Sequence, residues 1–198
     1  MKKSLTAACI SILAFAAHAQ STSFDVGFKD ASTLVNGSKI NPVVYSEKAN
    51  DARLDPLDLK DGVLKVSGQV GLGGGSQWAG IGVQLPGTDA QSPQDAREMK
   101  TVTFNLASAT TKNLRLRLMG NEDGIINSGC YPVFYQTVTP EVTRYDIPVK
   151  SFESENWCGP KARTVTQTLT NFTGFEVADI AVQKKATTFL VGSISLHR

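Results

Sequence analysis

A strict two-residue alternation near the middle of the chain restricts the fold more than any other feature. Leu114, Leu116 and Leu118 alternate there with Arg115 and Arg117. A repeat of two residues is that of a β-strand, in which successive side chains point to opposite faces of a sheet. The pattern therefore predicts a strand whose leucines face a core and whose arginines face solvent.

A turn and a second strand follow this segment. Residues 120–129 are rich in Gly and Asn, which favour turns. Residues 134–138 are mostly aromatic or β-branched, as is typical of strands. We therefore predict two strands within residues 112–138. Their outer face carries guanidinium groups, amides and Tyr135, a surface suited to a polar ligand.

Similar short strands recur along the chain, and no segment shows a sustained helical period. We interpret residues 51–61 and 151–171 as loops, and residues 20–62 as irregular apart from one short strand. About eight strands joined by polar turns predict an all-β fold, an antiparallel β-sandwich. The other predicted strands are 43–45, 63–68, 78–85, 101–106, 143–149, 175–177 and 189–196.

The first 19 residues predict a secretory signal peptide. Lys2 and Lys3 precede an apolar run over residues 5–17, and Ala17 and Ala19 frame a small-x-small cleavage site. The apolar run is too short to span a bilayer. We therefore expect residues 20–198 to form a single exported domain, periplasmic or secreted.

Charge and histidine content exclude several classes of function for that domain. The chain has 20 Lys and Arg against 18 Asp and Glu, so loss of Lys2 and Lys3 leaves a formal net charge of zero. No basic excess remains to bind nucleic acid or an anionic membrane. His197, next to the C-terminus, is the remaining histidine, which excludes a histidine-dependent triad or a His-rich zinc site.

Two cysteines remain in residues 20–198, Cys130 and Cys158. In an oxidising compartment such a pair predicts a disulfide bond, although two free buried thiols are the alternative. Residues 157–160 read Trp-Cys-Gly-Pro, like the start of a thioredoxin site, but Lys161 stands where the second cysteine belongs. We favour the structural disulfide.

Three further motifs are weak. The Gly-rich stretch 71–76 lacks the helix that a phosphate-binding loop needs, so we interpret it as a flexible turn. The acid pairs Glu122–Asp123 and Glu153–Glu155 are candidate glycosidase carboxylates, but we interpret both as solvated surface. Calcium often stabilises this architecture, but no acidic loop has dense ligand spacing, and the candidate oxygen donors are spread over the sequence. These donors are Asp25, Asp30 and Asp179.

One set of side chains is predicted to share the outer face of a sheet: Trp78, Gln84, Arg115, Arg117 and Tyr135. Sugar recognition uses such a set, with an aromatic plane against the ring and forked donors on the hydroxyls. The alternative is an ordinary strand surface, in which the arginines pair with neighbouring acids and the tryptophan caps the core. The residues alone do not separate the two interpretations.

The order of the strands over residues 60–198 carries a family resemblance. It runs through 81–85, 102–106, 114–118, the strand of Tyr135, 143–149 leading into Phe152, and a closing pair around Phe175 and Phe189. This order resembles galactose-binding-like β-sandwiches, in particular family 11 carbohydrate-binding modules and the complex I intermediate-associated domain. These relatives commonly carry an acid where this chain has Gly192, which speaks against a structural calcium ion.

The resemblance implies a jelly roll that binds polysaccharide or oligosaccharide on its concave face, without a cofactor and without catalysis. Two alternatives stay open. An envelope assembly or adhesion protein would use the same face for a protein partner. A small glycoside hydrolase would need the acid pairs.

Overall fold

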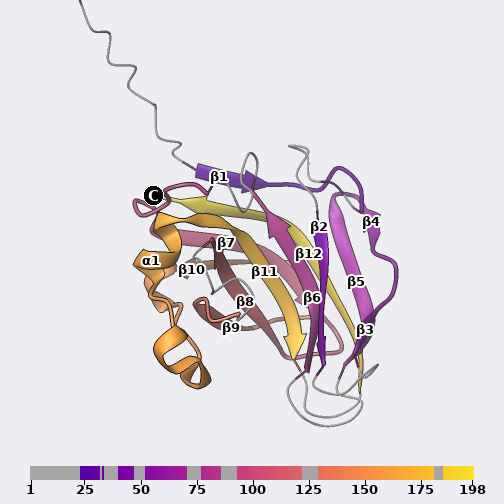
Figure 1. Cartoon of the computed structure of the whole chain (residues 1–198). Coiled ribbons are helices and arrows are strands. Elements are labelled where there is room, and N and C mark those ends of the chain that lie inside the picture. The colour runs from indigo at the N-terminus through magenta and orange to yellow at the C-terminus, as the bar shows by residue number, and fades with distance from the viewer. Residues whose placement is uncertain are drawn as a thin grey trace, which may run out of the picture.

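A computed structural model describes residues 23–31, 33, 40–46, 52–70, 77–85, 93–121, 129–180 and 185–198. The predicted signal peptide, the Gly-rich stretch 71–76 and the Glu122–Asp123 pair lie outside these residues. In the described part of the chain, twelve strands form two antiparallel sheets that pack face to face (Figure 1). The predicted all-β sandwich is confirmed.

One sheet has seven strands. Its main path is β10-β7-β12-β5-β3, while β1 pairs with β12 and β4 with β5. The strands are β1 (Ser23–Val26), β3 (Arg53–Leu54), β4 (Asp58–Lys60), β5 (Val63–Val70), β7 (Thr101–Ser108), β10 (Thr143–Pro148) and β12 (Lys185–His197). Pro148 ends an edge strand, as its missing N–H requires.

The second sheet has five strands in the order β2-β6-β11-β8-β9. They are β2 (Ile40–Ser46), β6 (Gln77–Gln84), β8 (Asn113–Gly120), β9 (Val133–Thr137) and β11 (Phe172–Ile180). Strands β8 and β9 are the pair predicted within residues 112–138, and Arg115 lies opposite Tyr135 in their register.

The core lies between the two sheets, and the leucines of β8 are part of it. Leu114, Leu116 and Leu118 are fully buried, as their alternation predicts. Phe104 of the seven-stranded sheet meets Phe175 of the five-stranded sheet edge to face, with ring centroids 5.6 Å apart. Burial of these large side chains supplies the main driving force for the sandwich.

Three short strands and one helix depart from the sequence interpretation. Strands β1, β3 and β4 occupy segments that we interpreted as irregular or loop, and all three add to an existing strand. The predicted loop 151–171 contains helix α1 (Val165–Thr170), which a capping box between Thr164 and Gln167 starts. Two 3-10 helices, η2 (Val149–Ser151) and η3 (Asn156–Lys161), precede it. No helix in the described ranges has both the length and the apolar character needed to cross a membrane.

Candidate functional site

The outer face of the five-stranded sheet carries two arginines that share one carboxylate. Arg117 of β8 lies directly opposite Glu176 of β11 in the register, and Arg115 lies opposite Ala178, two residues along. Arg115 Nη2 lies 2.9 Å from Glu176 Oε1, and Arg117 Nη1 lies 3.1 Å from Glu176 Oε2. All three side chains are at most 4% exposed. The expectation that these arginines face solvent is therefore wrong.

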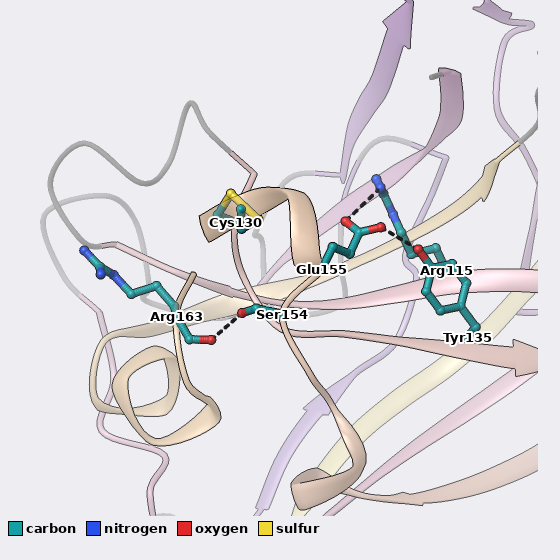
Figure 2. The surroundings of a disulfide bond; sticks show 7 residues. Arg115, Cys130, Tyr135, Ser154, Glu155 and Arg163 are labelled. Atoms are coloured by element: carbon teal, nitrogen blue, oxygen red, sulfur yellow. Dashed lines mark hydrogen bonds and ion pairs between the residues drawn. A yellow bond between two sulfur atoms is a disulfide. The ribbon is translucent and has the colours of Figure 1, made fainter. Parts of the chain in front are cut away.

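A second carboxylate closes over this group from outside the sheet. Glu155, just before η3, places Oε2 at 3.7 Å from Arg115 Nη1, and its Oε1 accepts a 2.5 Å hydrogen bond from the Tyr135 hydroxyl (Figure 2). The interpretation of Glu155 as solvated surface is wrong, since its side chain is 16% exposed. We call Arg115, Arg117, Glu155 and Glu176 the arginine cluster.

The cluster shifts two neighbouring pKa values. Burial raises the pKa of Tyr135 to about 12, and the hydrogen bond to Glu155 acts in the same direction. Burial also lowers the pKa of Arg117, and the nearby charge of Arg115 adds to this effect while Glu176 opposes it. Arginine nevertheless stays protonated at neutral pH, so the cluster contains two cations.

Trp78 stands between an aromatic ring and a guanidinium group. Its ring stacks on Tyr45 with centroids 4.1 Å apart and an interplanar angle of 15°. The Arg115 Cζ atom lies 4.4 Å from the Trp78 ring centre. Since β2 and β8 lie on opposite sides of β6 in the sheet, the two partners cover opposite faces of the indole. Trp78 therefore offers an edge rather than a face to a ligand.

Small residues make this arrangement possible. Gly80 and Ala178 occupy the same row of the sheet as Arg115, so no bulky side chain stands between its guanidinium and Trp78. A Cβ atom on Gly80 would lie 2.1 Å from the carbonyl oxygen of Val177. The close approach of β6 and β11 at this point therefore requires glycine.

The predicted disulfide Cys130–Cys158 is present, with Cα atoms 5.5 Å apart. Cys130 follows Gly129, whose Cβ position lies 3.4–3.6 Å from the guanidinium atoms of Arg117. The backbone N–H of Cys158 donates to the carbonyl of Glu155. The bond thus joins a loop that covers Arg117 to a loop that covers Arg115.

A groove of about 200 Å³ opens on the same sheet face, beside the arginine cluster. Its polar lining comes from three amides and a hydroxyl, and Met119 adds an apolar wall. The amides and hydroxyl belong to Asn41, Gln84, Asn121 and Thr173. Gly82 also lines the groove and lies opposite Glu176 in the register, so the groove and the cluster adjoin. We call this feature the amide groove.

Four of the five residues predicted for this face meet at the arginine cluster: Trp78, Arg115, Arg117 and Tyr135. Gln84 lies on the same face but lines the amide groove instead. Sequence reasoning missed Tyr45, Glu155 and Glu176. For Glu176 a signal existed, because a charged residue alternates with Phe175 and Val177 as Arg115 does with leucines. For Glu155 no local pattern existed, since its partners are distant in sequence.

The acidic residues considered for calcium do not gather. Asp25 accepts a hydrogen bond from Ser23. Asp179 is fully buried and accepts hydrogen bonds from Thr111 and Thr187 at 3.1 and 2.6 Å. Within the described ranges, no group of three or more His, Cys, Asp or Glu side chains is placed to hold a metal ion.

Comparison with known proteins gives structural matches alone. No family model matches the chain, and no curated protein gives a significant match. A family 11 carbohydrate-binding module from Clostridium thermocellum, solved in complex with a β-1,3-1,4-mixed-linked tetrasaccharide, matches with a TM-score of 0.59 at 17% identity. The match covers 89% of this chain and 97% of that one.

Two further solved structures match the chain over most of its length. A solution structure of the Clostridium thermocellum module CtCBM11 matches with a TM-score of 0.56 at 20% identity, over 91% of this chain and 97% of that one. A family 30 carbohydrate-binding module matches with a TM-score of 0.51 at 13% identity, over 87% of each chain. The chain therefore has the β-sandwich fold of family 11 carbohydrate-binding modules.

Proposed function

We propose that this chain is an exported, non-catalytic protein that binds a polysaccharide or oligosaccharide. The ligand lies on the outer face of the five-stranded sheet, which we take to be the concave face. The observation that carries this proposal is the amide groove, which opens on that face next to the arginine cluster. Amide and hydroxyl side chains can both donate to and accept from sugar hydroxyls.

Exposed aromatic rings extend this surface. Tyr45 is 41% exposed and Tyr135 is 44% exposed, and they stand on β2 and β9 at the two edges of the sheet. Their rings supply apolar planes of the kind that pack against the C–H face of a sugar. Trp78 supports Tyr45 by stacking on it, so Tyr45 rather than Trp78 presents a ring face to the ligand.

The structural neighbours support the same assignment at the level of the fold. The family 11 module was solved with a bound tetrasaccharide. Since fold alone does not establish function, the groove and the tyrosines carry the proposal for this chain.

A titration against soluble polysaccharides, including mixed-linked β-1,3-1,4-glucan, tests the proposal by calorimetry. We expect saturable binding to at least one polymer, and Gln84→Ala should weaken it by about tenfold through the loss of hydrogen bonds. Gln69→Ala is the matched control, because Gln69 of β5 lies on the outer face of the other sheet. If a folded protein binds none of the polymers in the panel, the result contradicts the proposal. Release of reducing ends from a polysaccharide would instead establish that the protein is a glycoside hydrolase.

A further inference from the structure

The centre of the outer face of the five-stranded sheet is covered by its own arginines. The guanidinium carbons of Arg115 and Arg117 lie 4.4 and 6.0 Å from the ring centre of Trp78. Since Trp78 belongs to β6, both side chains extend from β8 over β11. Gly80 and Ala178 are buried at this place although they face away from the core. A ligand on this face therefore meets the amide groove rather than the centre of the sheet.

The amide groove is neutral. Among the residues that the structure describes, its lining contains no charged side chain. The aromatic residue in that lining, Phe175, is fully buried and so offers no ring to a ligand. Recognition in the groove must therefore rest on hydrogen bonds to amides and one hydroxyl, and on contact with the side chain of Met119. A carboxylate or an ammonium group would find no opposite charge among these groups.

The amides of the groove stand on two opposite sides. Asn41 of β2 and Gln84 of β6 lie on one side, and Asn121, directly after β8, lies on the other. Strand β11 separates β6 from β8, so the two sides are roughly 10 Å apart across the strands. Each side offers both N–H donors and a carbonyl acceptor.

A secondary amide fits between two such sides. It is planar and trans, so its N–H and its C=O point in opposite directions. With one hydrogen bond at each end it spans roughly 8 Å, close to the separation of the two sides. A ligand amide can thus donate to one side of the groove and accept from the other.

The floor of the groove leaves space for a small apolar group beside such an amide. Met119 lies opposite Gly174 in the register, so no side chain faces its thioether there. A Cβ atom on Gly82 would lie 3.5 Å from Val43, an ordinary contact, so packing of the sheet does not require glycine at this position. The missing side chain instead leaves the groove open over β6. A methyl group placed there can pack against the polarisable side chain of Met119.

We propose that the ligand contains an N-acetylated amino sugar and that the amide groove binds its acetamido group. This inference rests on the proposed function and names the class of sugar. A sugar with hydroxyl groups alone can also hydrogen-bond to the amides, but it has no methyl group for Met119. The acetamido group supplies a donor, an acceptor and a methyl group as one rigid unit, which loses little conformational freedom on binding.

The test compares two tetrasaccharides with the same β-1,4-linked backbone. One consists of N-acetylglucosamine and the other of glucose, so each unit differs by an acetamido group in place of a hydroxyl. Both are titrated into the protein by calorimetry, together with N-acetyl-tetraglycine, which carries amides without a sugar. We expect the acetylated tetramer to bind at least about tenfold more tightly than the glucose tetramer, from the added hydrogen bonds and the buried methyl group.

Two variants locate the effect in the groove. Asn121→Ala removes the amide of one side and should bring the ratio of the two affinities close to one. The backbone N–H of residue 121, which donates to the carbonyl of Asn171, remains in this variant. Gly82→Val fills the floor and should weaken the acetylated tetramer at least about tenfold. Gln69→Ala on the other sheet is the control and should leave the ratio unchanged, and thermal unfolding verifies that each variant folds.

Equal binding of the two tetramers, or tighter binding of the glucose tetramer, overturns the inference and leaves the proposed function standing. A preference for the acetylated tetramer that survives in a folded Asn121→Ala or Gly82→Val variant also overturns it, because the acetamido group would then be bound elsewhere. Tighter binding of N-acetyl-tetraglycine than of the acetylated tetramer overturns the assignment to a sugar. If the protein binds no carbohydrate here or in the wider panel, both the inference and the proposed function are removed.

Discussion

The guanidinium carbon of Arg115 lies 4.4 Å from the ring centre of Trp78, on the face of the indole that Tyr45 leaves uncovered. An aromatic pair and a cation–π contact thus meet on one side chain. Both contacts stabilise the folded sheet before any ligand arrives. Trp78 is therefore part of the support of the site as well as part of its surface.

Replacement of Trp78 should destabilise the fold. We expect Trp78→Ala to lower the free energy of unfolding by about 2 kcal/mol, since it removes the stacking partner of Tyr45 and the ring beneath Arg115. Urea unfolding followed by circular dichroism measures this change. Trp157→Ala is the control, because Trp157 is 61% exposed and its loss should cost less than about 0.5 kcal/mol. Equal effects of the two substitutions would contradict the packing described for Trp78.

The buried and exposed ion pairs should differ strongly in their contribution to stability. Arg115→Ala leaves Glu176 with one partner fewer in a buried position and should cost about 3 kcal/mol of unfolding free energy. Arg144→Ala breaks an exposed pair with Asp146 and should cost less than about 1 kcal/mol. Chemical denaturation of both variants provides the comparison. A small loss for Arg115→Ala would mean that water enters the cluster.

The sequence predicted the sandwich well because the driving pattern is local. Alternation in β8 places the leucines of one strand toward the core whatever the partner strands are, and the disulfide follows from a pair of cysteines in a chain that we expect to be exported. The alternation does not predict whether the arginine face of the same strand is exposed or buried. Glu155 lies next to Arg115 and Gly129 lies next to Arg117, and both come from loops whose position depends on the whole fold.

The same reasoning explains the missed elements. Strands β3 and β4 have two and three residues, too few to show a period, and their positions depend on pairing with β5. Helix α1 has six residues, which is less than two turns. Its capping box was the one readable signal, since Thr164 and Gln167 have the spacing of that motif.

Tyr135 should ionise at unusually high pH. Its pKa of about 12 exceeds the ordinary value of 10.0, so the folded state favours the neutral phenol. The contribution of Tyr135 to stability is fully present below pH 10.0 and is lost as the pH rises through about 12. Ultraviolet absorbance during alkaline titration should show this component, and Tyr135→Phe should remove it.

Glu155→Gln provides the control for that titration. It removes the acceptor charge beside the phenol, so the pKa of Tyr135 should fall toward its ordinary value. Burial is the larger cause of the shift and remains in the variant, so the fall should be partial. An unchanged pKa would contradict the contact between Tyr135 and Glu155.

Removal of the disulfide should lower stability and increase proteolysis. The bond joins residues 28 positions apart, for which the loop-entropy estimate is about 3.5 kcal/mol. A variant with Cys130→Ser and Cys158→Ser should lose about this free energy of unfolding. It should also be cleaved faster by proteases within residues 155–163, because the loop is no longer tied to Cys130. Unchanged proteolysis would show that backbone hydrogen bonds alone hold this loop.

The predicted signal peptide has a direct chemical test. Exported protein should begin at Gln20, and intact mass spectrometry should show loss of residues 1–19 together with the mass of an oxidised cysteine pair. A mass that retains the first 19 residues would contradict cleavage after Ala19.

The Cys130–Cys158 bond bears on when the surroundings of the two arginines are completed. It joins the covers of Arg117 and Arg115, and bonds of this kind form outside the reducing cytoplasm. A newly made chain with reduced cysteines would contain the two arginines but would lack the covalent link between the two loops that cover them. Under the proposed export and function, this link would form in the same compartment in which the glycan is met.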